Sequence, residues 1–209
     1  KKICYFQTTY PEELWPLEVS EAAVINNDQS PLPSSELKTQ WVLRIRVRRY
    51  DGRMDELNPS SLRFYLSGDA RTTQCLYDSI FGYHPTNHTP VFIKADNADI
   101  PIRLPEGAVM PVGFAEEESL IPYPHKTPKS YRLLYEYFVF PNKFKFIDIK
   151  HFTVSGANHY VDIYIPLADR SQASTFRVGH HNFQLGCTPI INLFHKISEP
   201  IDLNHQSVS

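Results

Sequence analysis

The segment 41–49 constrains the fold of this chain most, because its apolar and basic side chains alternate. Four apolar residues would share one face of a strand: Trp41, Leu43, Ile45 and Val47. Three arginines would share the other face: Arg44, Arg46 and Arg48. A period of two residues is typical of an antiparallel strand with one buried face and one face toward water. We therefore expect a sheet built on this strand.

Shorter segments repeat the strand pattern elsewhere in the chain. Leu62, Phe64 and Leu66 alternate with polar neighbours. Short apolar runs predict further strands at 3–10, 17–21, 91–93, 100–104, 109–114, 144–149, 161–167 and 200–205, and leave 183–194 ambiguous. The 17 prolines against 8 glycines predict many short elements, because proline disfavours helix interiors and central strands. The 13 Phe and 12 Tyr suit half-buried sheet surfaces.

Residues 69–82 change to the period of a helix. Leu76 and Ile80 lie four residues apart and would share one helical face. Asp69 suits the N-cap and Gly82 suits the C-terminal end. A first short helix is therefore expected here.

A second helix is predicted over residues 128–138. Thr127 suits its cap and Pro128 its first position. Leu134 and Phe138 lie on one stripe, which we expect to pack on a sheet. On this interpretation Phe138→Ala costs ~3–5 kcal/mol, as for other buried aromatic residues.

Strands outnumber helices and do not alternate with them regularly. We expect an α+β fold of mainly antiparallel, sandwich-like sheet with two short helices, in a single domain over residues 1–209. Residues 26–40, rich in Asn, Ser and Pro, are expected to form a mobile surface loop. Because the chain begins with Lys1, we interpret it as an internal fragment of a longer protein.

Charge and cysteine content exclude several function classes. The net charge of −2 predicts no nucleic-acid partner. No apolar run approaches the ~18 residues that span a bilayer, so membrane insertion is not expected. The three cysteines show no disulfide pattern and favour a reducing compartment.

The histidines and cysteines do not show the spacing of a metal site. The best cluster is His180, His181, Cys187 and His195. Zinc sites use compact pairs two to four residues apart, whereas this pair is adjacent and the other two positions are spread out. His84 and His88 are four apart but flank Pro85, which disfavours a helix. We predict no metal and no cofactor, so that chelator should leave the melting temperature unchanged.

Catalytic patterns are equally weak. Cys187, after Gly186, is the one candidate nucleophile, and a single such cysteine is usually a small apolar residue. The acidic run 116–118 does not provide two carboxylates facing each other across a substrate. We therefore predict no catalytic site.

The basic side of segment 41–49 is the best candidate binding surface. With the adjoining Arg49 it forms a row of four arginines and no lysine: Arg44, Arg46, Arg48 and Arg49. Arginine is favoured at protein interfaces because its planar head pairs with carboxylates in two places. We predict that these arginines meet an acidic surface of a partner, although a solvated sheet face is the alternative.

Longer phrases of the sequence resemble a known family. They are TTYPEELWPLEV (8–19), LRFYLSGD (62–69), LIPYP (120–124), SYRLLYEYFVFPNKFKFIDI (130–149), FQLGCTPIINLF (183–194) and EPIDLNH (199–205). In this order they resemble the middle region of the TssF family, also called ImpG or VasA. The family members are much longer than 209 residues.

The resemblance implies a role rather than a reaction. TssF proteins are structural subunits of the baseplate wedge of the type VI secretion system, which supports sheath and tube assembly and effector delivery. It implies assembly with TssG, TssE, TssK and the spike hub, a cytoplasmic location at the inner face of the cell envelope, and self-association of the longer protein. Two alternatives from other classes are a carbohydrate-binding β-sandwich module and a cysteine hydrolase that uses Cys187.

Overall fold

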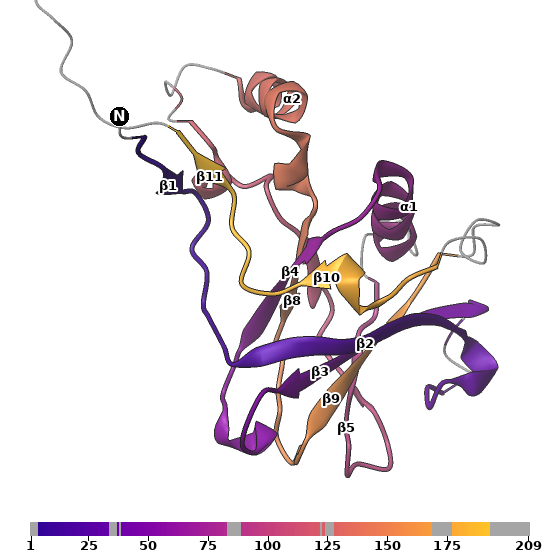
Figure 1. Cartoon of the computed structure of the whole chain (residues 1–209). Helices are drawn as coiled ribbons and strands as arrows, with labels where there is room; N and C mark the ends of the chain where they lie inside the picture. The colour runs from indigo at the N-terminus through magenta and orange to yellow at the C-terminus, as the bar shows by residue number, and fades with distance from the viewer. Residues whose placement is uncertain are drawn as a thin grey trace, which may run out of the picture.

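The computed structural model describes residues 4–33, 37, 39–82, 89–121, 123, 128–168 and 177–192 of the 209-residue chain. Within these residues the chain forms two antiparallel sheets, two α-helices and a separate two-stranded pair (Figure 1). The predicted α+β class with mainly antiparallel sheet is confirmed.

The larger sheet is built around β3, the alternating segment of the sequence. In spatial order its strands are β2 (Leu17–Asn26), β3 (Trp41–Arg49), β9 (Tyr160–Pro166), β5 (Phe92–Ala95) and β6 (Ile102–Arg103). All neighbours are antiparallel. Leu43, Ile45 and Val47 are fully buried, so the predicted apolar face of β3 is confirmed.

The smaller sheet joins distant parts of the sequence. In spatial order its strands are β10 (Phe183–Gln184), β4 (Ser61–Leu66), β8 (Phe146–Lys150) and β7 (Val109–Pro111). A separate antiparallel pair consists of β1 (Gln7–Thr8) and β11 (Ile190–Ile191). The ambiguous segment 183–194 thus supplies two short strands within its described part. The strand predicted at 200–205 lies outside the described residues.

One apolar core lies between the two sheets. Its members include Leu43 and Ile45 of β3, Phe64 of β4 and Ile147 of β8. The helix α1 (Ala70–Phe81) adds Leu76 and Ile80 to the same core. The predicted caps of α1 are present: the Asp69 carboxylate accepts a hydrogen bond from the Thr72 N–H at 2.9 Å, and Gly82 follows as the C-cap.

The second helix, α2 (Lys129–Val139), forms where it was predicted but faces the other way. Leu134 is 55% exposed and Phe138 is 76% exposed, so the prediction that this stripe packs on a sheet is wrong. Arg132 and Glu136 are the buried residues of α2, because their polar groups reach partners beneath the helix. Pro128 is the residue before the helix rather than its first residue, and Thr127 lies outside the described residues.

Five short 3-10 turns complete the described elements. They are η1 (Asn27–Gln29), η2 (Met54–Glu56), η3 (Glu116–Glu118), η4 (Pro141–Phe144) and η5 (His180–Asn182). The predicted surface loop 26–40 contains η1 and also two buried apolar residues, Leu32 and Leu37, which pack with Val42 of β3. Part of this segment therefore belongs to a small second core, and its mobility stays a prediction.

No helix in the described part of the chain is both long and apolar enough to span a bilayer.

Candidate assembly surface

Arg44, Arg46 and Arg48 of β3 lie together on the outer face of the sheet, as the alternation predicts. Arg46 makes two parallel hydrogen bonds to Asp162 of β9, at 2.7 and 2.9 Å. Its guanidinium also lies 3.9 Å from the ring centre of Tyr160, within cation–π range. Asp162 is 5% exposed, and its hydrogen bond is the main cause that raises the pKa of Arg46 above its ordinary value. This pair is a structural element of the sheet.

The other three arginines also have carboxylate partners within the chain. The pairs are Arg44–Glu21, Arg48–Glu18 and Arg49–Glu56. Arg48 has the most exposed side chain of the four, at 57%. Pairing within the chain accounts for the clustering of like charges without any partner. The predicted role of this row in binding a partner therefore stays a proposal.

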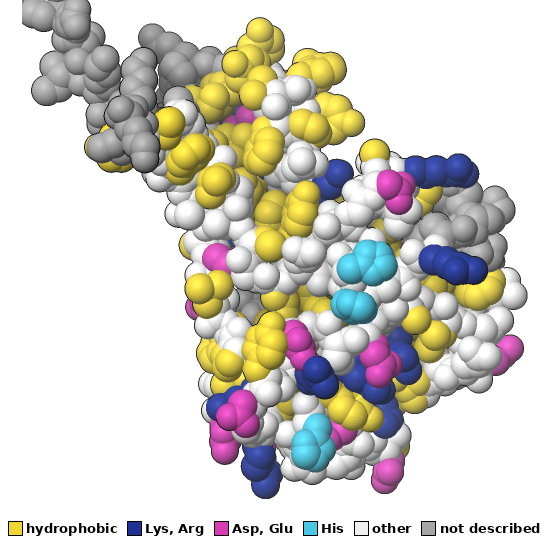
Figure 2. Space-filling view, viewed as in Figure 1, with side chains coloured by type: hydrophobic (Ala, Val, Ile, Leu, Met, Phe, Trp, Pro, Cys, Tyr) yellow, Lys and Arg dark blue, Asp and Glu magenta, His cyan; other side chains and the backbone are white. Residues whose placement is uncertain are grey.

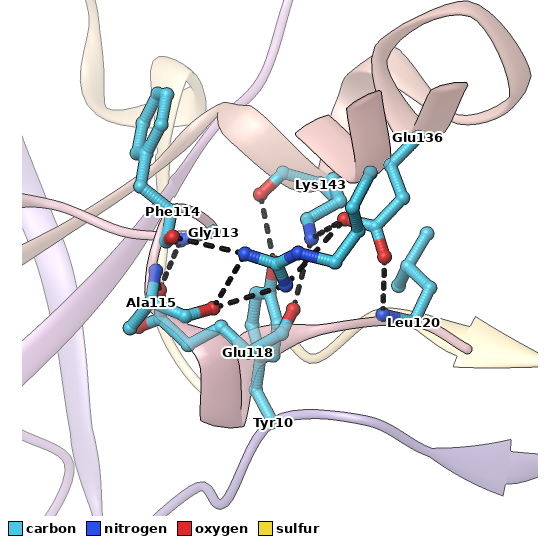
Figure 3. Close-up of polar contacts among 9 residues, drawn as sticks. Tyr10, Gly113, Phe114, Ala115, Glu118, Leu120, Glu136 and Lys143 are labelled. Atoms are coloured by element: carbon cyan, nitrogen blue, oxygen red, sulfur yellow. Dashed lines mark hydrogen bonds and ion pairs between the residues drawn. The ribbon is translucent and has the colours of Figure 1, made fainter. Parts of the chain in front are cut away.

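Beneath α2 lies a buried ionic network, which Figure 3 shows from one side. The Glu136 carboxylate accepts hydrogen bonds from the Lys143 ammonium at 2.5 Å and from the Leu120 N–H at 2.8 Å. The same ammonium donates to the Glu118 carbonyl at 2.9 Å. Lys143 and Glu136 are 0% and 1% exposed, and burial lowers the pKa of Lys143 although Glu136 opposes this shift. Such a pair is tolerated in an interior only when its polar atoms are satisfied.

Further hydrogen bonds tie this network to the loop after β7. The Arg132 guanidinium donates to the Ala115 and Phe114 carbonyls, at 3.1 Å each. The Glu118 carboxylate accepts from the backbone N–H groups of Gly113 and Ala115, at 2.7 and 3.0 Å. The inner side of α2 is therefore held by polar contacts, unlike the apolar packing beneath α1.

The outer side of α2 carries an apolar stripe. Its members, spaced three and four residues apart, are Tyr131, Leu134, Tyr135 and Phe138, and all four are exposed. Residues at this spacing lie on one face of a helix. Figure 2 shows hydrophobic side chains gathered where α2 lies. Tyr137 lies beside the stripe and its ring contacts Phe144 at a centroid distance of 6.1 Å. A contiguous exposed apolar surface is typical of an interaction site.

The comparison with family models now decides the family. The model described as "Type VI secretion system, TssF" matches residues 1–209. The chain belongs to the TssF family. The sequence-based resemblance is thereby confirmed.

Two known proteins illustrate this relationship. The type VI secretion system component TssF1 of Pseudomonas aeruginosa (strain PAO1) is 32% identical over 214 residues, which cover 96% of this chain and 33% of the relative. A chain in the cryo-electron microscopy structure of the type VI secretion system TssK-TssF-TssG baseplate subcomplex superposes with a TM-score of 0.73. That match is 23% identical and covers 98% of this chain and 37% of the other, so it shows a shared fold. This TssF-family chain thus spans about a third of the length of these relatives.

The cysteine that the sequence offered as a nucleophile lies in an unfavourable setting. Cys187 is partly buried and packs beside the cluster formed by Tyr10, Val112 and Phe146. Burial is the main cause that raises the pKa of its thiol, with Glu12 adding to the shift. A reactive cysteine needs the opposite shift, toward the thiolate.

The remaining catalytic and metal candidates do not converge. His180 and His181 stand edge to face on η5, with ring centres 5.8 Å apart. Within the described residues there is no group of three or more histidine, cysteine or acidic residues that could hold a metal ion. His84, His88 and His195 lie outside these residues. Within the acidic run 116–118, the Glu118 carboxylate accepts hydrogen bonds from the backbone of the loop after β7. It is therefore not part of a free carboxylate cluster.

A cleft of about 480 Å³ lies beside β4. Its lining includes Glu12, Trp15, Tyr50, Arg63 and Asp148. Arg63 and Asp148 form a two-point ion pair across β4 and β8, with hydrogen bonds of 2.7 and 2.8 Å. Burial is the main cause that raises the pKa of Glu12 to about 7. The sequence did not predict this cleft, because its walls come from five segments that lie far apart in the chain.

Proposed function

We propose that this chain is the middle part of a structural subunit of the type VI secretion baseplate wedge, and that it is not an enzyme. The outer face of α2 carries the proposal, because an apolar surface on a firmly held helix suits protein–protein contact. Membership of the TssF family indicates that the assembly is the type VI secretion baseplate. A chain of similar fold occurs in the structure of a TssK-TssF-TssG baseplate subcomplex, which motivates TssG and TssK as partners.

The proposal extends to the remaining expectations from the family. TssE and the spike hub are further partners, self-association belongs to the longer protein, and the location is cytoplasmic at the inner face of the cell envelope. The subunit supports the assembly of sheath and tube, and thereby effector delivery. Neither a cofactor nor a metal has a part in it.

Copurification of the complete polypeptide tests this function. Coexpressed with the TssG and TssK homologues of the same organism, the protein should elute with both as one complex at physiological salt. Elution of each protein alone would contradict the proposal. Alkylation of Cys187 provides the parallel test against the hydrolase: a slow reaction, typical of a partly buried thiol, is expected, and fast thiolate-like alkylation would favour catalysis.

The row of arginines on β3, which comprises Arg44, Arg46, Arg48 and Arg49, is a proposed second contact surface. Arg48 is the member best placed for it, since more than half of its side chain is exposed. Arg48→Ser should weaken assembly modestly and reduce its salt dependence, as expected of charges at the edge of an interface. Unchanged assembly across a salt series would leave the row as a solvated sheet face.

The carbohydrate-binding alternative loses the strand residue that the sequence offered for it. A sugar platform needs exposed, flat aromatic side chains. Trp41, the strand residue considered for that role, packs against the main core instead.

A further inference from the structure

The side chain of Tyr10 joins the β1–β11 pair to the network beneath α2. Tyr10 is 2% exposed, and its hydroxyl donates a hydrogen bond to the Lys143 carbonyl at 3.2 Å (Figure 3). Its ring lies edge to face with Phe146 of β8, at a centroid distance of 5.6 Å. The Arg63 guanidinium of β4 lies 5.4 Å from the centre of the same ring. Groups from three separate elements therefore fix the position of this side chain.

The backbone around Tyr10 is tied to the segment that leads into β11. The Thr188 hydroxyl donates to the Tyr10 carbonyl at 3.0 Å and accepts from the Tyr10 N–H at 3.2 Å. The Thr9 N–H donates to the Pro189 carbonyl at 3.0 Å. The strands β1 and β11 have two residues each, and a two-stranded pair is marginally stable at best on its own. The order of this pair therefore depends on the anchoring of Tyr10.

Lys143 connects the same contact to α2. Its backbone carbonyl accepts from Tyr10, whereas its ammonium donates to Glu136 of α2 and to the Glu118 carbonyl. The loop after β7 packs closely on this junction, because a Cβ added at Gly113 would lie 3.0 Å from the Lys143 carbonyl oxygen and 3.1 Å from the Tyr10 hydroxyl. Displacing Tyr10 would remove a buried hydrogen bond from the residue that holds α2, at a cost in free energy.

The elements joined in this way do not share the apolar core of the two larger sheets. Among the described residues, none in β1, β11, η3, η4 or α2 belongs to the main core. They are held instead by polar contacts and by a small cluster whose buried members are Tyr10, Val112 and Phe146. In Figure 1, α2, β1 and β11 lie above the larger sheet. Regions with few buried apolar contacts open at a lower free energy than the core, in contiguous units.

We propose that the β1–β11 pair and α2 form one cooperative unit, joined through Tyr10 and Lys143, which opens while the main core stays folded. A contact that separates β1 from β11 then loosens α2. A contact that holds α2 protects the pair in return, because coupling between two sites is reciprocal. This coupling is a property of the chain itself and holds whatever covers the outer face of α2.

Hydrogen exchange read by mass spectrometry tests the coupling in the complete polypeptide. Thr188→Val removes a hydroxyl that bonds to Tyr10 and Pro189 rather than to α2. It should speed exchange in the peptides of β1, β11 and α2, and at the Leu120 amide that donates to Glu136, by a shared factor of ~2- to 10-fold, as the loss of one hydrogen bond does. Exchange in β3 and β9 should not change.

Two further variants complete the test. The matched control is Thr39→Val, which removes a buried hydroxyl that donates to the Leu167 carbonyl at 2.6 Å beside β9 and should leave exchange in α2 unchanged. Tyr10→Phe keeps the ring, deletes only the hydroxyl, and should speed exchange in the same peptides as Thr188→Val.

Three results would overturn the proposal. Faster exchange confined to β1 and β11 in both Thr188→Val and Tyr10→Phe would mean that the pair and the helix open independently. An equal rise in β3 and β9 would mean that α2 opens only together with the main core. Unchanged exchange throughout would mean that Tyr10 and Thr188 hold neither element.

Discussion

The outer face of β3 and the outer face of α2 differ in where their charged side chains lie. On β3, Arg44, Arg46 and Arg48 lie on the outer face and each is paired with a carboxylate of the same chain. On α2, the charges are buried and the apolar side chains are left outside. The charged face thus already has its ion pairs within the chain, whereas the apolar side chains on the outer face of α2 are exposed. Of the two, α2 has more free energy to gain from a partner.

Breaking the network beneath α2 should have the largest effect on stability. Lys143→Met removes a buried ammonium and leaves Glu136 with the Arg132 guanidinium, 4.0 Å away, as its remaining charged partner, which should cost ~3–5 kcal/mol of unfolding free energy. Chemical denaturation of the isolated chain measures this cost. Lys129→Met makes the same substitution at an exposed position and should cost no more than ~0.5 kcal/mol. Equal small costs would mean that the network does not hold α2.

When an arginine of the row is replaced, the loss of unfolding free energy should increase with the burial of its partner carboxylate. Arg46→Ser leaves Asp162 buried without its partner and should cost about 2 kcal/mol. Arg48→Ser breaks an exposed pair and should cost no more than ~0.5 kcal/mol. The alternation alone places Arg44, Arg46 and Arg48 on a face toward water, where replacing a side chain costs little, and the pairing of Arg46 changes that expectation. Similar losses in both variants would refute the ranking.

In the cleft beside β4, the carboxylate of Glu12 lacks such a pairing. Arg63 is held by Asp148, whereas Glu12 has no comparable two-point partner among the described residues. Burial raises the pKa of Glu12 to about 7, and Arg63 opposes this while Asp148 and Glu13 add to it. Between pH 4.5 and 7 the folded chain keeps a proton that the unfolded chain has lost, so stability should fall as pH rises through this window.

Denaturation at pH 5 and at pH 7.5 measures this pH effect. Glu12→Gln should flatten the decline, and Glu117→Gln, at an exposed position on η3, should leave it unchanged. A wild-type decline that survives in Glu12→Gln would assign it to another group.

The smallest effect is expected at the residue for which the sequence predicted a large one. Phe138→Ala should change the stability of the isolated chain by no more than ~0.5 kcal/mol, because the side chain is 76% exposed. Phe64→Ala, in the core, should cost ~3–5 kcal/mol in the same measurement. A comparable loss from both would mean that α2 packs on the sheet after all.

The sequence predicted most of the fold because local patterns decide it. The alternation of β3 identified the buried face that Leu43, Ile45 and Val47 share, and Asp69 and Gly82 identified the ends of α1. These features depend on neighbours in the chain. Pairings such as β10 with β4 could not be predicted, because they join segments more than a hundred residues apart.

The orientation of α2 could not be predicted for a different physical reason. Periodicity shows which residues share a face of a helix, but not which face is covered. Leu134 and Phe138 do share a face, as predicted, yet Arg132 and Glu136 on the opposite face find hydrogen-bond partners that only the folded structure provides. The one available signal was the i, i+4 spacing of Arg132 and Glu136 on an otherwise apolar helix.

Surface labelling of α2 before and after assembly tests the central claim most directly. Carbene footprinting of the isolated protein should label Tyr131, Leu134 and Phe138 strongly, and the assembled complex should protect all three while Ile100 stays labelled in both. Weak labelling of the stripe in the isolated protein would contradict the exposed face of α2. Equal labelling in both states would contradict its role as an assembly surface.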